Sequence, residues 1–182
     1  KRLDRAGNNT YFAISSFCTK ENRKQENVNK TKVIAIDVDC GNGKPFADWR
    51  EGLKALQDYI IRMKLPKPMV VSSGNGLHVY WVLTKELEPD EWKPIANAVK
   101  ASALDKGFKA DAGLIANSSL VLRPIGTHNP KNGKEVKLLI DADPVTPEEL
   151  SARLHNYVLS TGPAAGQQTS DLSLIHISEP TR

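Results

Sequence analysis

Two aspartates stand two residues apart in an apolar stretch whose sequence is VIAIDVDCG. In a β-strand, residues i and i+2 share a face, so Asp37 and Asp39 would lie on one surface and the alternate apolar residues on the other. Like charges at that spacing repel, and a cation or a basic neighbour between them removes the repulsion. The pair predicts a cation-binding surface, and the alternative interpretation is a solvated strand end.

A second polar cluster lies in residues 68–83, where two short apolar runs flank Asn75–Gly76. Asn-Gly is a strong hairpin signal, and a two-residue turn there predicts three facing pairs: Gly74 with Leu77, Ser73 with His78, and Val71 with Tyr80. Glycines such as Gly74 and Gly76 let a backbone approach a bulky anion, and His78 could contact phosphate oxygens or move a proton. The alternative is a surface histidine after a tight turn.

The third cluster, LVLRPIGTHNPKNGK, spans residues 120–134. It gathers Arg123, Thr127, Asn129 and Lys131 around a glycine-rich turn. A guanidinium fork with a lysine charge is typical of a triphosphate or nucleic-acid cradle. An ordinary hairpin loop built of turn residues is the alternative. Just upstream, Asp111 offers a third acid.

Taken together, the three clusters supply acids for divalent metals and basic groups for phosphates. Two divalent ions clamped by acids, with a nucleotide's phosphates held nearby, carry out in-line phosphoryl transfer. This combination gives the paired aspartates a chemical role that neither cluster indicates alone.

Elements that position these clusters follow from the residue patterns. Residues 10–17 read as a first strand, residues 47–64 as a helix by its apolar spacing, and residues 88–107 as a second helix that begins near Pro89. Short strands and loops follow to Asp141, and a last helix over 146–159 opens with a capping-box pattern. The order predicts an α/β or α+β fold with a mixed or antiparallel sheet.

Bulk composition sets limits on partners and compartment. The formal net charge of +4 suits an anionic partner such as nucleic acid. Two cysteines and four scattered histidines make a structural zinc site unexpected. Without an apolar run of membrane-spanning length or a signal-peptide core, we expect no membrane association and a cytoplasmic location.

The chain divides near residue 160. We expect residues 1–159 to form one catalytic domain. Residues 160–182 begin with a low-complexity stretch and read as a flexible linker. The final LSLIHISEPTR resembles translated sequencing-adapter read-through, so we interpret it as a non-native tail without function.

The motifs AIDVD, SSGNGLHVYW and VLRPIGTHNPKNG, with Asp111 and Asn117 between the second and third, occur in a family order with compatible spacing. This set resembles the archaeo-eukaryotic primase superfamily, in particular the primase-polymerases of phages and mobile elements. The resemblance spans about residues 11–141. It implies a catalytic α/β core with an RRM-like sheet that bears the acids, plus an N-terminal α/β module.

The resemblance also implies roles for particular residues. Asp37, Asp39 and Asp111 match the metal-binding acids, which implies two Mg²⁺ or Mn²⁺ ions, and His78 matches the histidine that contacts the incoming nucleotide's phosphates. Nucleotide or template contact is implied for the segment that holds four polar residues: Arg123, Thr127, Asn129 and Lys131. The chain departs from the family where Ser-x-His reads Gly76-Leu77-His78, so the hydroxyl contact is either lost or supplied by Ser73 across the hairpin. It departs again where RPIGT stands for R-x-P-G-T.

The function expected is a template-dependent DNA primase or polymerase that adds dNTPs or NTPs to a 3′-hydroxyl in phage or plasmid replication, in a bacterial or archaeal host. DNA template and primer are the expected partners, and a helicase domain could follow in the full-length protein. One alternative is a non-catalytic replication-initiator module that binds DNA. Another is a metal-dependent phosphodiesterase, since two-metal chemistry runs in both directions. The basic loop over residues 20–32 could follow the template backbone or be a solvated loop.

Overall fold

The structure, a computed structural model, describes residue 4 and residues 7–161. Of the predicted linker and tail, residues 160–182, only residues 160 and 161 are described, and both belong to the last helix; the rest lies outside the described residues. The regular elements, in chain order, are β1 (Phe12–Ala13), β2 (Ser15–Phe17), the 3-10 turn η1 (Gln25–Asn27), β3 (Val28–Val38), α2 (Trp49–Met63), β4 (Met69–Ser72), β5 (Leu77–Leu87), α3 (Pro89–Asp105), β6 (Val121–Leu122), β7 (His128–Asn129), β8 (Lys134–Glu135), β9 (Lys137–Ile140), α4 (Pro147–Arg153) and α5 (His155–Thr161).

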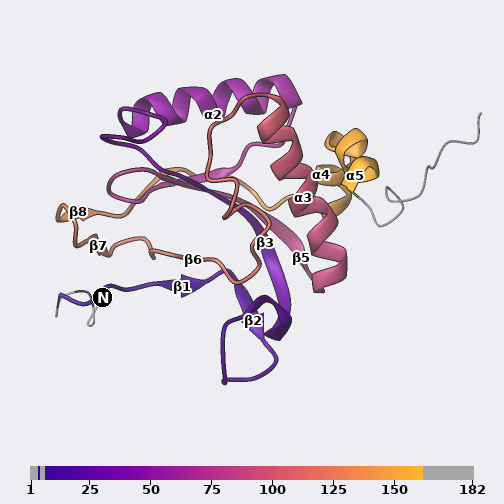
Figure 1. Cartoon of the computed structure of the whole chain (residues 1–182), viewed down its shortest axis with the longest axis horizontal. Helices are drawn as coiled ribbons and strands as arrows, with labels where there is room; N and C mark the ends of the chain where they lie inside the picture. Colours follow the sequence, from indigo (N-terminus) through magenta and orange to yellow (C-terminus); the bar gives the residue numbers. More distant parts are fainter. Residues whose placement is uncertain (1–3, 5–6, 162–182) are drawn as a thin grey trace, which may run out of the picture.

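A five-stranded antiparallel sheet forms the centre of the domain, with strand order β2-β3-β5-β4-β9. Two short ribbons, β1 with β6 and β7 with β8, lie on one side of this sheet, whereas α2 and α3 lie on the other (Figure 1). The expected α/β fold with an antiparallel sheet is confirmed. None of the described helices is both long and apolar enough to cross a bilayer.

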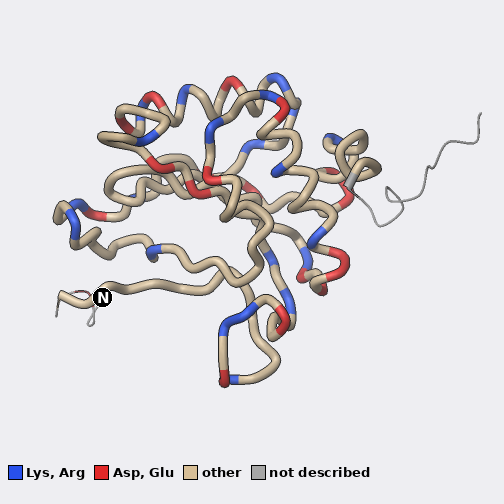
Figure 2. Tube along the Cα trace, viewed as in Figure 1, with Lys and Arg blue, Asp and Glu red and all other residues tan. Residues whose placement is uncertain are grey.

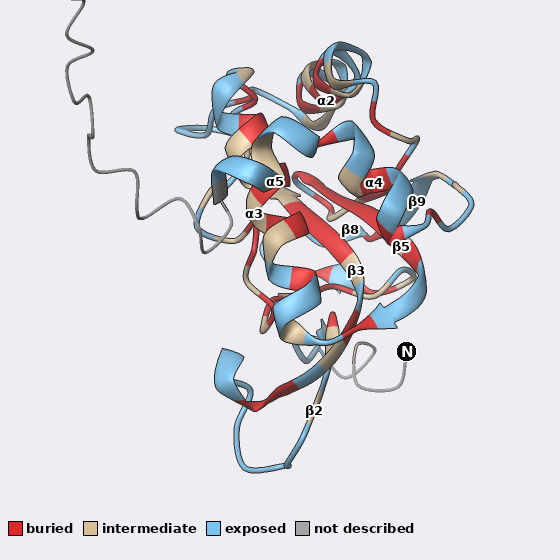
Figure 3. Cartoon of the chain, turned by 90° about the vertical axis from the view of Figure 1, so that its right-hand side faces the viewer, coloured by how far each residue is buried: buried red, intermediate tan, exposed pale blue. Residues whose placement is uncertain are grey.

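The face of the sheet toward the helices, which we call the helix face, is apolar. It carries the alternate residues Ile34, Ile36 and Val38 of β3, all of them fully buried. Helix α2 begins at Asp48, whose carboxylate accepts from the Arg50 and Glu51 amides. Figure 3 shows the buried residues concentrated along β3 and β5 beneath α3. This packing is the hydrophobic core that holds the sheet rigid.

The opposite face of the sheet, the open face, carries the polar residues. The strand register places Asp37 opposite His78 and His78 opposite Val71, so these three lie in one row across β3, β5 and β4. Tyr80 lies two residues further along β5, and its ring meets the His78 ring edge-on at 6.2 Å. The ribbons β1–β6 and β7–β8 lie over this face and enclose the row (Figure 1).

The β4–β5 hairpin is confirmed, but its predicted register is wrong. Ser72 pairs with Leu77, and the Ser73 amide donates to the Gly76 carbonyl at 3.0 Å, so the turn residues are Gly74 and Asn75. Of these two, only Gly74 has a positive φ, +91°. An Asn-Gly turn of the predicted type needs positive φ at both positions, whereas a turn with glycine first needs it at one. His78 therefore faces Val71 and Asp37, and not Ser73.

Two other predicted elements are each divided. The first strand breaks at Ile14, because β1 pairs with β6 while β2 pairs with β3 in the central sheet. The last helix breaks at Leu154, which is buried between α4 and α5. Its predicted capping contact is present, since Thr146 Oγ1 accepts from the Glu149 amide at 3.0 Å. Periodicity alone could not reveal these breaks, since both halves continue the same apolar pattern.

Candidate active site

Two acids, Asp37 and Asp39, lie at the end of β3, and the backbone of a third, Asp111, contacts this end. Asp37 lies on the open face, Asp39 follows the strand end, and the Asp111 amide donates to the Asp37 carbonyl at 3.2 Å. Burial, followed by the negative charges of Asp39 and Asp111, raises the pKa of Asp37 to about 7. The sequence-predicted acids are therefore neighbours, and their mutual repulsion would be relieved by a cation.

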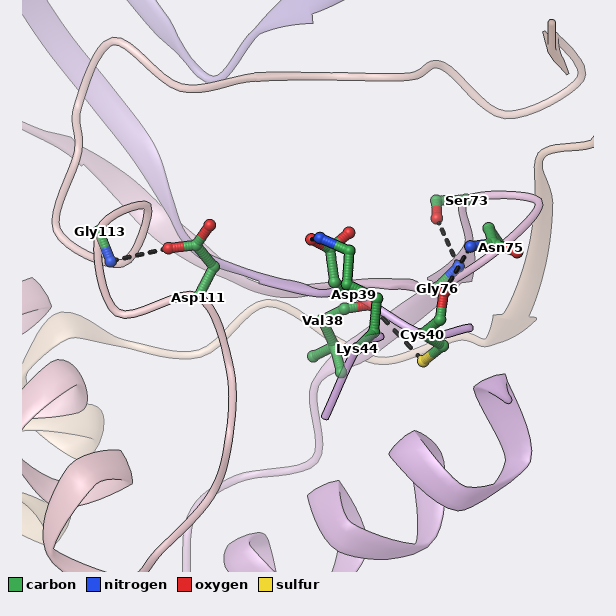
Figure 4. Close-up of polar contacts among 9 residues, drawn as sticks. All are labelled: Val38, Asp39, Cys40, Lys44, Ser73, Asn75, Gly76, Asp111 and Gly113. Carbon is green, nitrogen blue, oxygen red and sulfur yellow. Dashed lines mark hydrogen bonds and ion pairs between the residues drawn. The ribbon is translucent and has the colours of Figure 1, made fainter. Parts of the chain in front are cut away.

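Two of these carboxylates have internal partners. Lys44 Nζ donates to Asp39 Oδ2 at 2.7 Å, and Asp111 Oδ1 accepts from the Gly113 amide at 2.9 Å. Figure 4 shows Lys44 against Asp39, with Asp111 separated from them. Within residues 4 and 7–161, no three acid, histidine or cysteine side chains are arranged as a group that could hold a metal ion.

The chemistry of the donor set nevertheless fits Mg²⁺ or Mn²⁺, since both prefer carboxylate oxygens. Burial is the largest cause of the raised pKa of Asp37, the negative charges of Asp39 and Asp111 add to it, and the positive charge of Lys44 only partly offsets these effects. The Lys44 side chain is about half exposed on a flexible stem, with a relative accessibility of 47%. It can leave Asp39 without any change in the backbone.

The β4–β5 turn packs directly against the segment that carries the acids. A Cβ added to Gly76 would lie 2.0 Å from the Val38 carbonyl oxygen, so only glycine fits there. The Asn75 amide group donates to the Cys40 carbonyl, and Ser73 Oγ accepts from the Gly76 amide at 3.0 Å (Figure 4). The predicted glycine-rich cluster is thus fixed beside Asp39.

A cavity of about 260 Å³, the site cavity, lies between this turn and the strand end. His78 and Arg123 both line it and are almost fully buried, with 4% and 8% of their surface exposed. His78 Nδ1 and one terminal nitrogen of Arg123, Nη1, have no hydrogen-bond partner among the described residues. Unpaired buried polar atoms are costly, so an anion in the site cavity would be stabilised by both side chains.

Burial, with the charge of Arg123 as the smaller cause, lowers the pKa of His78 to about 4. His78 is therefore a neutral imidazole at pH 7. Tyr11 holds Arg123 in place, because Arg123 Nη2 donates to the Tyr11 hydroxyl at 2.8 Å and the guanidinium carbon lies 4.6 Å from the ring centroid. The second terminal nitrogen, Nη1, is left for a ligand.

Some residues of the third predicted cluster hold the loop in place, and others line the site cavity. Thr127 Oγ1 donates to the Pro124 carbonyl at 2.7 Å, so its hydroxyl is used within its own turn. Asn129 Nδ2 donates to the Ser73 carbonyl at 3.2 Å, which ties this segment to the β4–β5 turn. Of the predicted site residues, eight line the site cavity: Asp37, Asp39, Ser73, Gly76, His78, Arg123, Asn129 and Lys131. The other three, Gly74, Asp111 and Thr127, do not line it.

Sequence reasoning missed three polar residues of the site: Tyr11, Lys44 and Asn75. Lys44 follows the paired aspartates within a glycine-rich loop, so a search for a basic neighbour of Asp39 could have found it. Asn75 was assigned to the turn but without a contact to the acid segment. Nothing in the local sequence marks Tyr11, because its partner Arg123 is 112 residues away.

No protein-family model matches the sequence, and no curated protein matches it. Among solved structures, the chain is similar to the AEP domain of the primase-polymerase of cyanophage S-2L, with a TM-score of 0.62 and 17% identity over 80% of this chain and 70% of that one. It is also similar to the catalytic domain of primase RepB′, solved in complex with initiator DNA, with a TM-score of 0.57 and 17% identity over 93% of this chain and 74% of that one.

Proposed function

From the archaeo-eukaryotic primase fold that this chain has, we propose that it is a nucleotidyltransferase that extends a 3′-hydroxyl on a DNA template. One observation carries the proposal. The site cavity places the acids Asp37 and Asp39 beside the unpaired nitrogens of His78 and Arg123. A nucleoside triphosphate with its divalent metal suits both the acids and the unpaired nitrogens, because the metal would bind the acids and the phosphates would bind the nitrogens.

The acids Asp37, Asp39 and Asp111 would hold Mg²⁺ or Mn²⁺, and the ions when bound would stabilise charge on the attacking hydroxyl and on the leaving pyrophosphate. Lys44 would release Asp39 as the metal enters and could then pair with a phosphate oxygen. The burial of Asp37 favours this exchange, since a carboxylate of raised pKa gains more from a nearby cation.

The remaining residues would bind and orient the triphosphate. Arg123 lines the site cavity and leaves Nη1 unpaired, and Lys131 adds an ammonium at the wall of the cavity. Neutral His78 would bind a phosphate oxygen by an N–H that donates from the ring, without adding charge near the metal. The amides of Gly74 and Gly76 donate within the turn, to Ser72 Oγ and Ser73 Oγ, so the phosphates would be bound by side chains and not by these amides.

DNA template and primer are the partners of this activity, and dNTPs, NTPs or both are its substrates. The RepB′ domain solved with initiator DNA supports DNA as the ligand. Replication of a phage or plasmid genome, with a helicase domain elsewhere in the longer protein, is the setting that we propose.

Incorporation of labelled nucleotide on a primed DNA template tests the function. The purified protein is assayed with Mg²⁺ or Mn²⁺ and separate dNTP and NTP pools, beside Asp37→Ala/Asp39→Ala. Extension by the native chain that disappears in the variant supports the proposal, and an unprimed template then tests priming. Absence of extension under every condition overturns it.

A DNA-binding initiator module without catalysis is the second candidate. It is favoured by the ion pair between Lys44 and Asp39, which neutralises one acid without a metal. That function predicts DNA binding that is unchanged in Asp37→Ala and no incorporation by either protein. The same assay with a DNA-binding measurement therefore separates the two candidates.

A further inference from the structure

The loop that joins β2 to β3 and the start of β3 are strongly basic. Residues 18–32, which we call the basic arm, contain five cations and two acids, a net charge of +3 against +4 for the whole chain. The loop extends away from the body of the domain at the end of β3 opposite Asp37 (Figures 1 and 3). Figure 2 shows Lys and Arg positions along this loop. The projecting loop, residues 18–27, carries a net charge of +1, and Lys30 and Lys32 at the start of β3 supply the rest.

The basic arm is held in a defined shape by one buried side chain. Asn27 is 8% exposed, and its Oδ1 accepts from both the amide and the hydroxyl of Thr19 at 3.1 Å. Its Nδ2 donates to the carbonyls of Thr19 at 3.1 Å and Asn22 at 2.6 Å. Lys93 of α3 ties the arm to the body by donating to Gln25 Oε1 at 3.2 Å. The arm therefore loses little conformational entropy when it binds a ligand.

The cations of the arm are available to an external anion. Lys24 meets Glu26 at only 3.7 Å, and both side chains are 71% exposed. In the described part of the chain, Lys20 and Arg23 make no ion pair, and both are exposed. Exposed charges without internal partners suit a sequence-independent contact with phosphates.

An apolar cavity of about 440 Å³ lies on the open face between the arm and the candidate active site. Phe12 lies at its wall with 41% of its surface exposed, and the Phe12 and Tyr80 ring centroids are 6.5 Å apart. Lys32 of the arm lines this cavity, and so does Arg123, which also lines the site cavity. A continuous path therefore runs from the arm, past aromatic side chains, to the acids.

We propose that the basic arm and the apolar cavity together hold a single-stranded template strand on its way to the active site. The cations contact successive phosphates, and the cavity receives unpaired bases against Phe12. Cationic grooves combined with aromatic side chains are typical of single-strand binding, since a duplex hides the base faces. The inference deepens the proposed function, because the strand held here would be the one that is copied.

Strand geometry gives the scale of the contact. Nine residue steps separate Val28, where the loop of the basic arm ends and β3 begins, from Asp37. At about 3.3 Å per residue, this is a distance of about 30 Å. At about 3.4 Å between stacked nucleotides, this span corresponds to about nine nucleotides. An oligonucleotide of about 12 nucleotides is therefore long enough to reach both ends of the path.

Fluorescence anisotropy of a labelled oligothymidylate of about 12 nucleotides tests the proposal with the full chain, in EDTA and without nucleotides, over ~0.05–0.2 M KCl. The arm variant is Lys20→Gln/Arg23→Gln/Lys24→Gln. Its matched control, Lys54→Gln/Lys64→Gln/Lys67→Gln, removes three exposed cations around α2 and its C-terminal end. A third variant, Phe12→Ala, shortens the aromatic wall while leaving every charge in place. Thermal melting checks that all variants fold.

We expect the arm variant to bind at least about tenfold more weakly, and its plot of log K against log salt to flatten by about 2, since each phosphate contact on a single strand contributes about 0.7. The control should match the native chain. Phe12→Ala should weaken binding about tenfold with an unchanged salt slope, because stacking carries no counterion release. A duplex of equal length should bind less tightly than the single strand.

Equal losses in the arm variant and the control would overturn the inference, as would preference for the duplex or unchanged binding by Phe12→Ala. These results are independent of catalysis. If the single strand binds as expected but no nucleotide is incorporated, the proposed function fails and this inference stands. If extension occurs and the arm variant binds normally, the inference alone fails.

Discussion

The two faces of the central sheet differ in whether their buried polar groups are hydrogen-bonded. On the helix face, Trp92 Nε1 donates to the Val33 carbonyl at 2.9 Å and the Tyr59 hydroxyl meets Ser102 Oγ at 2.6 Å. On the open face, His78 and Arg123 are also buried, but each leaves a nitrogen unpaired. One sheet thus carries a satisfied core on one side and an unsatisfied polar surface on the other.

This difference indicates where stability and function are located. A fully paired, close-packed face stabilises the fold, whereas unpaired nitrogens and a carboxyl with a pKa near 7 cost stability unless a ligand compensates them. Substitutions on the helix face should therefore lower stability and leave chemistry intact. Substitutions on the open face should reduce activity without lowering stability.

Asp37→Asn should produce the largest effect on the open face. Extension should fall at least about 10³-fold, because a metal ligand is lost. In EDTA at pH 8 the variant should be more stable than the native chain, by up to about 4 kcal/mol, since the pKa is raised from its ordinary value of 3.8 to about 7 and each pH unit corresponds to about 1.4 kcal/mol. The raised pKa means that the folded state binds more protons, so ionisation of Asp37 destabilises the fold as the pH rises through about 7. Urea unfolding and primer extension measure the two effects, and a loss of both stability and activity would contradict the comparison.

Leu56→Ala should have the largest effect on the helix face. Leu56 of α2 is completely buried in the core, so the free energy of unfolding should fall by about 2–5 kcal/mol. Extension per folded molecule should stay near the native value at a temperature well below the melting point. A large loss of extension in the folded variant would show that the two faces are not separable.

Arg123→Lys should weaken nucleotide binding without abolishing chemistry. Lysine keeps the charge, but it cannot donate to the Tyr11 hydroxyl and to a phosphate in a fixed fork. We expect KM for the nucleoside triphosphate to rise about 10- to 100-fold, which corresponds to about 1.4–2.7 kcal/mol. Steady-state kinetics measure this change, and an unchanged KM would remove Arg123 from the binding site.

Tyr11→Phe should give the smallest effect. The ring over the guanidinium remains, and only the hydrogen bond to Arg123 Nη2 is lost. KM should rise about threefold to tenfold, in line with the loss of one hydrogen bond to a charged group, while kcat changes little. Tyr11→Ala should raise KM further. If both variants kept the KM of the native chain, Tyr11 would not position Arg123.

Much of the architecture could be predicted because local patterns determine it. The apolar spacing of α2, the strand that bears Asp37 and the β4–β5 hairpin all follow from residues close in sequence. The hairpin register could not be predicted, because the close approach of Gly76 to Val38 fixes it through a contact between distant segments. The contact between Tyr11 and Arg123 could not be predicted either, because it also joins distant segments.

For the acids of the site, too, the sequence predicted the residues but not their contacts. Their types and order predicted that Asp37, Asp39 and Asp111 belong together, and the amide of Asp111 does bond to the Asp37 carbonyl. Their side-chain partners could not be read from the motif, since Lys44 and Gly113 depend on how two loops fold. That these acids hold metal remains a prediction of the resemblance and of the donor chemistry.

The most direct test of the central claim compares Asp37→Asn and Leu56→Ala with the native chain in one primer-extension assay with Mn²⁺, together with urea unfolding of each protein. The account predicts that Asp37→Asn is folded, at least as stable as the native chain, and inactive, whereas Leu56→Ala is less stable but active when folded. Native-level extension by Asp37→Asn would contradict the claim that the open face is the active site.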